Sequence, residues 1–258
     1  MDALARIRQT ASDEGQAPRQ GALDFKLEHQ VAGLIPRGLI AFLFTGLLLA
    51  AAHSAVAVST GSFSDEELAF TVTRNGKPIG SHIYTFDRRG ARTVVDIETT
   101  IDFRLLTLPV YRFQHKSHEV WDGDRLVRLV SNTNDNGEPV TLDVRAEGQV
   151  LKVGGQEQAV EVDPKAIPAS LWNPVVVKRE RLLDTVNGAL MKTTVADLGD
   201  ETVTIAGKAI PARRYRLSGD YHRELWYDRR DGTLVRVMFE AKDGSEVEYV
   251  LTHRPAGA

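Results

Sequence analysis

Apolar and polar residues alternate with a period of two over most of the chain, from about residue 65 to residue 254. Between Val95 and Phe103 the apolar positions are separated by Asp96, Glu98 and Asp102, and residues 140–145 and 246–252 alternate in the same way. Successive side chains of a strand point to opposite faces, so this pattern predicts strands with one buried and one exposed face. Such strands are typical of antiparallel sheets.

Short turn motifs separate these runs, and Asn75-Gly76 and Asn136-Gly137 are the clearest of them. Asparagine–glycine pairs favour the tight hairpin turns that need positive φ angles. Similar signals occur at Arg89-Gly90, Asp122-Gly123, Gly154-Gly155, Gly207-Lys208, Asp231-Gly232 and Asp243-Gly244. The chain is therefore predicted to be mainly β, with about 8–11 strands in a curved antiparallel sheet or a partly open barrel.

The alternation breaks only over residues 164–198. Asp163-Pro164 and Asn173-Pro174 each place an N-cap residue before a proline that fits the first helical position. Residues 174–184 are predicted to form one short helix, whose apolar side contains Val175, Val176, Leu182 and Leu183. This stretch is expected to be a helical insertion that lies against the sheet.

Residues 38–57 have the features of an export signal. Arg37 precedes an uncharged apolar stretch from Gly38 to Ala52, and Ala55-Val56-Ala57 forms an A-x-A site. This order predicts a secretory signal peptide that is cut after Ala57. A retained membrane anchor is the alternative, because the apolar run approaches the length of a membrane span. The protein is expected to be periplasmic or exported in a bacterial envelope, or else anchored to the inner membrane with its domain outside.

The remaining organisation follows from these two patterns. Residues 1–37 are polar and lack periodicity, which predicts a disordered extension, and we expect synthesis to begin near Val31. Residues 61–254 are predicted to form a single β-sheet domain. Contact with the membrane is expected only if residues 38–58 stay uncut.

Composition excludes several kinds of site and partner. The chain has no cysteine, which rules out disulfides, cysteine–zinc sites and thiol nucleophiles. Its formal net charge of −3 gives no support for a nucleic-acid partner. The hydrophobic fraction of 42% is ordinary for a globular protein with a large core.

Four motifs together resemble a known family. They are Phe70-Thr-Val-Thr-Arg-Asn-Gly-Lys-Pro-Ile-Gly80, His115-x-x-His118-Glu-Val-Trp121, Ala169-Ser-Leu-Trp172-Asn-Pro174, and Leu225-Trp-Tyr-Asp228 continuing to Leu234-Val-Arg236. The chain resembles the exported bacterial proteins of domain-of-unknown-function family 6134. That resemblance implies a location and a fold, and no chemistry. A looser likeness to lipoprotein carriers implies a curved sheet around an apolar cavity beneath a helical lid.

No motif indicates a metal, a cofactor or a catalytic group. His115 and His118 are spaced by three, so on a strand they point to opposite faces and cannot share a metal. Residues 132–136 resemble part of a calcium loop, but a polar hairpin end explains them better. The sequence contains neither a Gly-x-Ser-x-Gly motif nor a glycine-rich loop before a helix. No catalytic residue can be selected, no cofactor is expected, and a non-enzymatic protein is favoured.

Aromatic residues are the remaining candidates for a site. The three tryptophans either anchor the core or line an apolar ligand cavity together with other aromatic residues. The candidate ligand-binding residues are Trp121, Trp172, Trp226, Tyr111, Phe113 and Tyr221. The apolar run from Leu105 to Tyr111 is expected to form a loop or rim that contacts lipid or a partner protein.

Three functions remain open at this stage. The favoured one is a module that binds an apolar or amphiphilic, lipid-like ligand. The alternative is an envelope structural or assembly factor that contacts another protein. A hydrolase with a dispersed site is the third.

Overall fold

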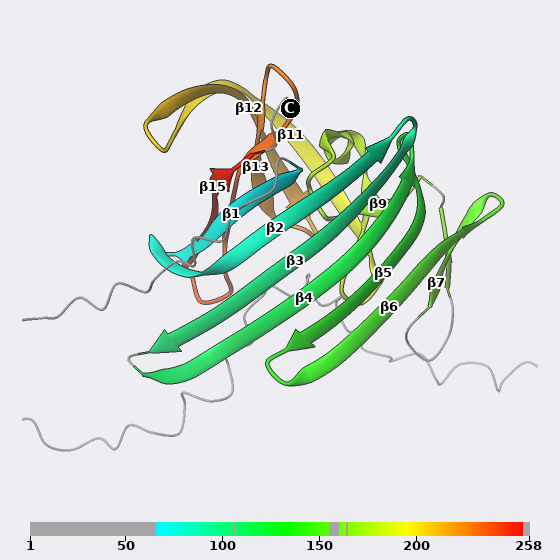
Figure 1. Cartoon of the computed structure of the whole chain (residues 1–258), viewed down its shortest axis with the longest axis horizontal. Helices are drawn as coiled ribbons and strands as arrows, with labels where there is room; N and C mark the ends of the chain where they lie inside the picture. Colours follow the sequence, from blue (N-terminus) through cyan, green and yellow to red (C-terminus); the bar gives the residue numbers. More distant parts are fainter. Residues whose placement is uncertain (1–65, 106, 155–159, 164, 255–258) are drawn as a thin grey trace, which may run out of the picture.

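The computed structural model describes residues 66–105, 107–154, 160–163 and 165–254, and the predicted extension and signal segment lie outside them. These residues form one sheet of fifteen strands, in the spatial order β8-β7-β6-β5-β4-β3-β2-β1-β15-β14-β13-β12-β11-β10-β9. All neighbouring strands are antiparallel except β9 and β10, which are parallel. Within the described part of the chain no pairing joins β8 to β9, so the sheet is curved but not closed (Figure 1).

The strands and the single helical turn have the following bounds. They are β1 (Glu67–Arg74), β2 (Lys77–Arg89), β3 (Arg92–Leu105), β4 (Leu108–Asp122), β5 (Arg125–Asp135), β6 (Glu138–Glu147), β7 (Val150–Gly154), β8 (Val160–Val162), β9 (Ile167–Pro168), η1 (Pro174–Lys178), β10 (Arg181–Leu183), β11 (Leu190–Ile205), β12 (Lys208–Gly219), β13 (Arg223–Asp228), β14 (Leu234–Glu240) and β15 (Glu246–His253).

The mainly β, antiparallel architecture predicted from the alternating pattern is confirmed. Along β4 buried and exposed residues alternate, as a strand with one buried face requires. Asn75-Gly76 joins β1 to β2 with φ angles of 47° and 74°, and Asn136-Gly137 joins β5 to β6 in the same way. Eleven strands have six residues or more, and β7–β10 add four short ones to the predicted number.

The helix predicted for residues 174–184 is much shorter in the structure. Asn173 caps a single 3-10 turn, because its side-chain oxygen accepts a hydrogen bond from the Val175 backbone N–H at 3.0 Å. The turn ends at Lys178, and Leu182 and Leu183 instead lie in β10, paired with β11. Both leucines are fully buried. Pairing with β11 satisfies their backbone groups inside the core, which an isolated helix end would not.

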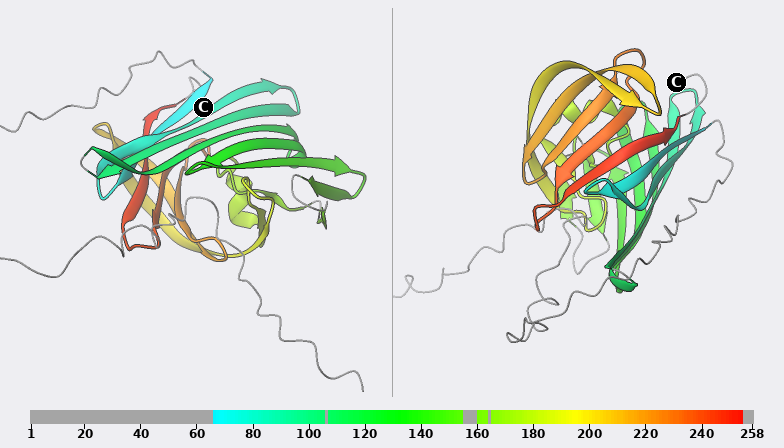
Figure 2. Two further views of the ribbon diagram at one scale, coloured as in Figure 1. Left: turned by 90° about the horizontal axis from the view of Figure 1, so that it is seen from below. Right: turned by 90° about the vertical axis from the view of Figure 1, so that its left-hand side faces the viewer.

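Residues 165–190, which we call the strap, cross the concave side of the sheet. Figure 2 shows the C-terminal strands, in yellow to red, curving round to face the N-terminal strands in green. The strap is anchored to strands on both sides. The Tyr84 hydroxyl on β2 donates to the Ser170 carbonyl, and the Tyr227 hydroxyl on β13 donates to the Leu171 carbonyl at 2.7 Å.

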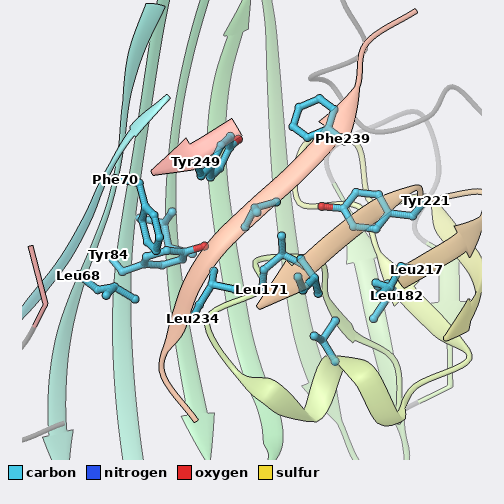
Figure 3. Close-up of a cluster of buried hydrophobic side chains, with 14 of the residues drawn as sticks. Leu68, Phe70, Tyr84, Leu171, Leu182, Leu217, Tyr221, Leu234, Phe239 and Tyr249 are labelled. Carbon is cyan, nitrogen blue, oxygen red and sulfur yellow. The ribbon is translucent and has the colours of Figure 1, made fainter. Parts of the chain in front are cut away.

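The core lies between the two walls of the sheet and includes the strap. Figure 3 shows Leu171 from the strap among Leu182, Leu217 and Leu234, with Tyr84 from the opposite wall beside them. Leu182 and Leu234 are fully buried. Among the described residues, the structure contains no helix with the length and apolarity needed to cross a membrane.

Candidate functional site

A row of polar residues crosses the concave face of the N-terminal strands. His82, Thr99, His115 and Thr133 are directly opposite one another on β2, β3, β4 and β5. All four side chains are buried. Polar groups in such positions need hydrogen-bond partners, because burying an unpaired polar group costs free energy.

Each histidine in the row is paired with a threonine and is electrically neutral. The His82 Nδ1 atom lies 2.6 Å from the Thr99 hydroxyl, and the His115 Nδ1 atom lies 2.8 Å from the Thr133 hydroxyl. Burial, with a smaller effect of His115, lowers the pKa of His82 to about 3. Burial also lowers the pKa of His115 to about 4. Both imidazoles are therefore uncharged near neutral pH.

A cavity of about 80 Å³ lies between this row and the strap. Its wall is mostly apolar and aromatic, with a few polar groups. The lining includes Ile97, Phe113, Leu171, Val186 and Met191, the tyrosines Tyr84, Tyr221 and Tyr249, and the polar residues His82, Thr99, His115, Asp184 and Arg223.

Three polar groups that line the cavity have hydrogen-bonding capacity left over. The buried His82 Nε2 atom has no partner among the described residues. The structure also gives the Tyr249 hydroxyl no partner there, and Arg223 no carboxylate within ion-pair distance. Arg223 is only 6% exposed. One of its nitrogens donates to the His222 carbonyl at 2.7 Å. These three groups are called the donor cluster.

Aromatic contacts bring the donor cluster together. The Tyr249 ring centre is 5.1 Å from the His82 ring and 6.4 Å from the Phe239 ring. The Arg223 guanidinium lies over Phe239 at 3.7 Å and over Tyr221 at 4.5 Å. Tyr249, Phe239 and Tyr221 belong to the same buried cluster in Figure 3. Burial raises the pKa of the Tyr249 hydroxyl, so it stays a neutral hydrogen-bond donor.

A second buried polar group, Glu119 on β4, has the opposite character. Its Oε2 atom accepts hydrogen bonds from the Trp121 indole at 2.9 Å, the Trp172 indole at 3.0 Å and the Ser170 hydroxyl at 3.3 Å. Burial raises the pKa of this fully buried carboxyl. We call this the Glu119 cluster. It ties the strap to β4, because Ser170 and Trp172 belong to the strap.

The sequence comparison decides the family. The model of DUF6134, a domain of unknown function, matches residues 70–252, which extend from β1 to β15. The chain belongs to the DUF6134 family. The resemblance based on four short motifs is thereby confirmed. No curated protein matches the sequence of this DUF6134 chain.

Two solved structures align with this DUF6134 domain at low sequence identity. One is a β-barrel-like protein of domain of unknown function DUF1849 from Brucella abortus. It aligns with a TM-score of 0.55 and 13% identity, covering 72% of this chain and 94% of that one. LprF from Mycobacterium bovis aligns with a TM-score of 0.24 and 13% identity, covering 75% and 87%. The first match shows a common fold alone, and the second carries no argument.

The structure distributes the predicted ligand-binding residues of the DUF6134 domain over three places. Phe113 and Tyr221 line the cavity, and buried Tyr111 lies two residues before Phe113 on the same face. Trp121 and Trp172 lie in the Glu119 cluster, where their rings are 5.4 Å apart. The role of all these residues as ligand contacts stays a prediction.

Trp226 lies on the convex face, outside the cavity. Its ring lies between the guanidinium groups of Arg214 and Arg236, at 5.0 and 4.7 Å. Its indole donates to Glu201 at 3.2 Å. Trp226 thus anchors the β11–β12 hairpin to the back of the sheet.

His115 and His118 point to opposite faces of β4, as predicted from their spacing. His115 is buried in the cavity wall, whereas His118 is exposed and lies 2.7 Å from Asp96. In the part of the chain that the structure describes, no group of three or more histidine, aspartate or glutamate residues could hold a metal ion.

The donor cluster was not predicted from the sequence. A signal for His82 was present, because His82, Tyr84 and Phe86 share one parity and are buried, while the residues between them are less buried. Arg223 likewise shares its parity with Leu225 and Tyr227. A polar residue at an inward position of a strand is therefore the pattern that would have identified both.

Leu105 and Leu108, from the apolar run 105–111, lie at the exposed end of the β3–β4 hairpin, whereas Tyr111 at the other end of the run is buried in β4. Leu105 is 65% exposed and Leu108 is 69% exposed. The other exposed large apolar residues among those described are Val127 and Leu198, which are only 37% and 40% exposed. The expectation of an exposed apolar rim is confirmed for Leu105 and Leu108.

Proposed function

We propose that this DUF6134 protein is a non-enzymatic binding module that holds a small amphiphilic ligand between the sheet and the strap. The observation that carries this proposal is the cavity itself, which combines an apolar wall with the unpaired donor cluster. Ligand sites in proteins are typically apolar pockets with a few placed polar groups. In a core that serves only to stabilise the fold, buried donors are normally paired with acceptors.

The size of the cavity limits the ligand. Its volume is about 80 Å³. An engineered apolar cavity of roughly 150 Å³ binds benzene. The DUF6134 cavity is about half as large, so it is suited to a molecule smaller than benzene or to one end of a longer molecule, and not to a whole lipid.

The chemistry of the cavity disfavours catalysis. The Thr99 hydroxyl lies 2.6 Å from His82, which resembles a nucleophile beside a general base. A general base works best when its pKa is close to the working pH. Burial lowers the pKa of His82 to about 3, so this imidazole is a weak base. The pair is better explained as a satisfied part of the cavity wall.

Native mass spectrometry of protein purified from its own host tests the binding function. Wild-type protein is expected to carry a small bound molecule. Ala169→Leu places a larger side chain in the cavity wall and is expected to abolish that adduct. Ala189→Leu is the matched control, because Ala189 is also half-buried in the strap but does not line the cavity. An adduct that survives in Ala169→Leu, or protein without any adduct in all three samples, contradicts the proposal.

We also propose that the protein works outside the cytoplasmic membrane, on the basis of the signal pattern at residues 38–57. N-terminal sequencing of the mature protein is expected to begin at Val58. Recovery of peptides from residues 1–30 contradicts both the cut after Ala57 and a start near Val31.

The exposed tip at Leu105 and Leu108 favours a second function, in which the hairpin contacts another envelope protein. Exposed apolar patches commonly mark interaction sites. A photo-crosslinking amino acid at position 108 is expected to capture one reproducible protein in intact cells. The same group at position 198, on the β11–β12 hairpin, is the control, because Leu198 is also exposed. Equal labelling from both positions removes this second candidate.

A further inference from the structure

We infer that the ligand carries a singly charged carboxylate as its head group, and that Arg223, Tyr249 and His82 bind it. This inference rests on the proposed binding function and names the chemical class of the ligand. The ligand is then a short aliphatic carboxylate, or the carboxylate end of a longer molecule.

Arg223 supplies the charge that such a head group requires. The Arg223 residue is only 6% exposed, and the described residues offer its guanidinium no carboxylate within ion-pair distance. Buried charges in proteins are normally paired, because removing an ion from water is costly. The Phe239 and Tyr221 rings stabilise the cation partly, at 3.7 and 4.5 Å. An anionic ligand would complete the pairing, and a guanidinium matches the two oxygens of a carboxylate.

Tyr249 and His82 add neutral donors beside this charge. The Tyr249 hydroxyl is protonated and has no partner in the described residues. The His82 Nδ1 atom is engaged by the Thr99 hydroxyl at 2.6 Å, while its Nε2 atom is buried and unpaired. If Thr99 donates to Nδ1, the ring proton is on Nε2, which then donates into the cavity. Arg223, Tyr249 and His82 thus offer hydrogen-bond donors that a ligand group rich in acceptors, such as a carboxylate, would satisfy.

The rest of the cavity limits the charge of the ligand to about one. Arg223 is the only cationic side chain in the lining, since His82 and His115 are neutral. Asp184 also lines the cavity, and its Oδ1 atom accepts the backbone N–H of Val186 at 2.7 Å and of Asn187 at 3.3 Å. A carboxylate in the wall repels a dianion such as phosphate. The remaining wall, which includes Phe113, is apolar and suits a short hydrocarbon part.

Isothermal titration calorimetry with hexanoate, 1-hexanol and inorganic phosphate tests the inference. Wild-type protein is expected to bind hexanoate more tightly than hexanol and to bind phosphate weakly or not at all. Arg223→Gln removes the charge-assisted hydrogen bonds, so hexanoate is expected to bind roughly 10- to 100-fold more weakly, with hexanol unchanged. Arg236→Gln is the control, because Arg236 lies on the convex face beside Trp226. It is expected to alter neither affinity.

Tyr249→Phe provides a second test that keeps the charge and the shape of the site. It is expected to weaken hexanoate about 3- to 10-fold and to leave hexanol unchanged, because one neutral hydrogen bond is lost. This variant keeps the ring contacts, so it answers the question even if Arg223→Gln does not fold.

The outcomes separate this inference from the proposed function. Equal affinity for hexanol and hexanoate, unaffected by either substitution, overturns the carboxylate assignment and leaves the binding module standing. Phosphate that binds as tightly as hexanoate also overturns it, since the site would then recognise charge alone. Failure of every alkyl compound to bind, with no adduct on the native protein, overturns both.

Discussion

The donor cluster and the Glu119 cluster lie on the concave side of the same sheet and differ in whether their hydrogen-bond donors have acceptors. In the Glu119 cluster, all three donors are satisfied by one carboxyl oxygen, Oε2, while the other oxygen, Oε1, is buried without a partner among the described residues. In the donor cluster, the His82 Nε2 atom and the Tyr249 hydroxyl have no partner among the described residues, and Arg223 makes one hydrogen bond, to the His222 carbonyl. Buried donors that stabilise a fold are normally satisfied internally, as the three donors of the Glu119 cluster are. The difference indicates that the Glu119 cluster fixes the strap and that the donor cluster binds a ligand.

Removing Glu119 is the substitution expected to have the largest effect. Glu119→Ala leaves the Trp121 and Trp172 indoles and the Ser170 hydroxyl without their acceptor, at a cost of about 4 kcal/mol in the free energy of unfolding. Glu119→Gln keeps an oxygen in place and is expected to cost about 1 kcal/mol. Arg223→Gln, measured without ligand, is expected to cost less than about 1 kcal/mol, because no ion pair is lost. Urea unfolding of the three variants at neutral pH measures these differences.

A small cost for Glu119→Ala would contradict the role of Glu119 in fixing the strap. A large cost for Arg223→Gln in the ligand-free protein would show that Arg223 is structural, and would remove the distinction between the two clusters.

The buried histidines and Glu119 are expected to make the unfolding free energy depend on pH in opposite directions. The pKa of His82 is lowered to about 3 and that of His115 to about 4, from 6.5 in the unfolded chain. The unfolded state therefore binds more protons below pH 6.5, and each histidine costs about 1.5 kcal/mol of stability between pH 6.5 and pH 5. Glu119 acts in the opposite direction, because burial raises its pKa and the folded state holds the proton to a higher pH than the unfolded state does. Acid therefore weakens the histidine row and favours the Glu119 cluster.

Glu119→Gln removes the opposing contribution and exposes the effect of the histidines. Its unfolding free energy is expected to fall by about 3 kcal/mol between pH 6.5 and pH 5, more than that of the wild type. His115→Asn in the same background is expected to halve that fall. Urea unfolding at the two pH values measures both changes. A fall that is the same in wild type and Glu119→Gln would contradict the raised pKa of Glu119.

Much of the fold could be predicted from local patterns. The assembly of the donor cluster from strands distant in the sequence could not. Period-two alternation and the Asn75-Gly76 turn are properties of neighbouring residues, so they identify strands and hairpins directly. The pairing of β1 with β15 joins Val72 to Tyr249 across most of the chain. That pairing carries Tyr249 to His82, and no local pattern encodes it. The donor cluster therefore remained hidden although His82 and Arg223 each had an inward parity.

The helix predicted at residues 174–184 was too long for a related reason. Asn173-Pro174 is a correct start signal, and a 3-10 turn begins there. The end of that turn is determined by tertiary pairing, because Leu182 and Leu183 are taken into β10 by β11. Likewise, Trp226 and Trp121 look equivalent in the sequence, but they lie on opposite faces of the sheet.

Gly188 tests whether the far end of the strap is held as firmly as the end at Glu119. Its φ is +75°, and an added Cβ atom would lie 2.5 Å from Val153 Cγ1 and 2.8 Å from Leu142 Cδ1. Gly188→Ala is expected to lower the unfolding free energy by about 2 kcal/mol, from backbone strain and displaced packing. Gly148→Ala has a φ of +57° and no neighbouring atom within 4 Å, so it measures the strain alone, about 1 kcal/mol. Equal losses of unfolding free energy for the two substitutions would mean that the strap shifts at Gly188 to accommodate the added methyl group, and is not held firmly there.

Three tyrosines give the smallest and most direct comparison of satisfied and spare hydroxyls. The Tyr84 and Tyr227 hydroxyls donate to strap carbonyls of Ser170 and Leu171, so Tyr84→Phe and Tyr227→Phe are each expected to cost about 1 kcal/mol. The Tyr249 hydroxyl has no acceptor in the described residues, and Tyr249→Phe is expected to change the unfolding free energy by less than about 0.5 kcal/mol. Urea unfolding of the three variants without ligand gives these values, and the ring contacts are kept in each. With a bound carboxylate, the cost of Tyr249→Phe in unfolding free energy is expected to rise relative to the other two variants, because only this variant loses a hydrogen bond to the ligand. A Tyr249→Phe cost equal to that of Tyr84→Phe in ligand-free protein would mean that the Tyr249 hydroxyl is already paired, and that it does not await a ligand.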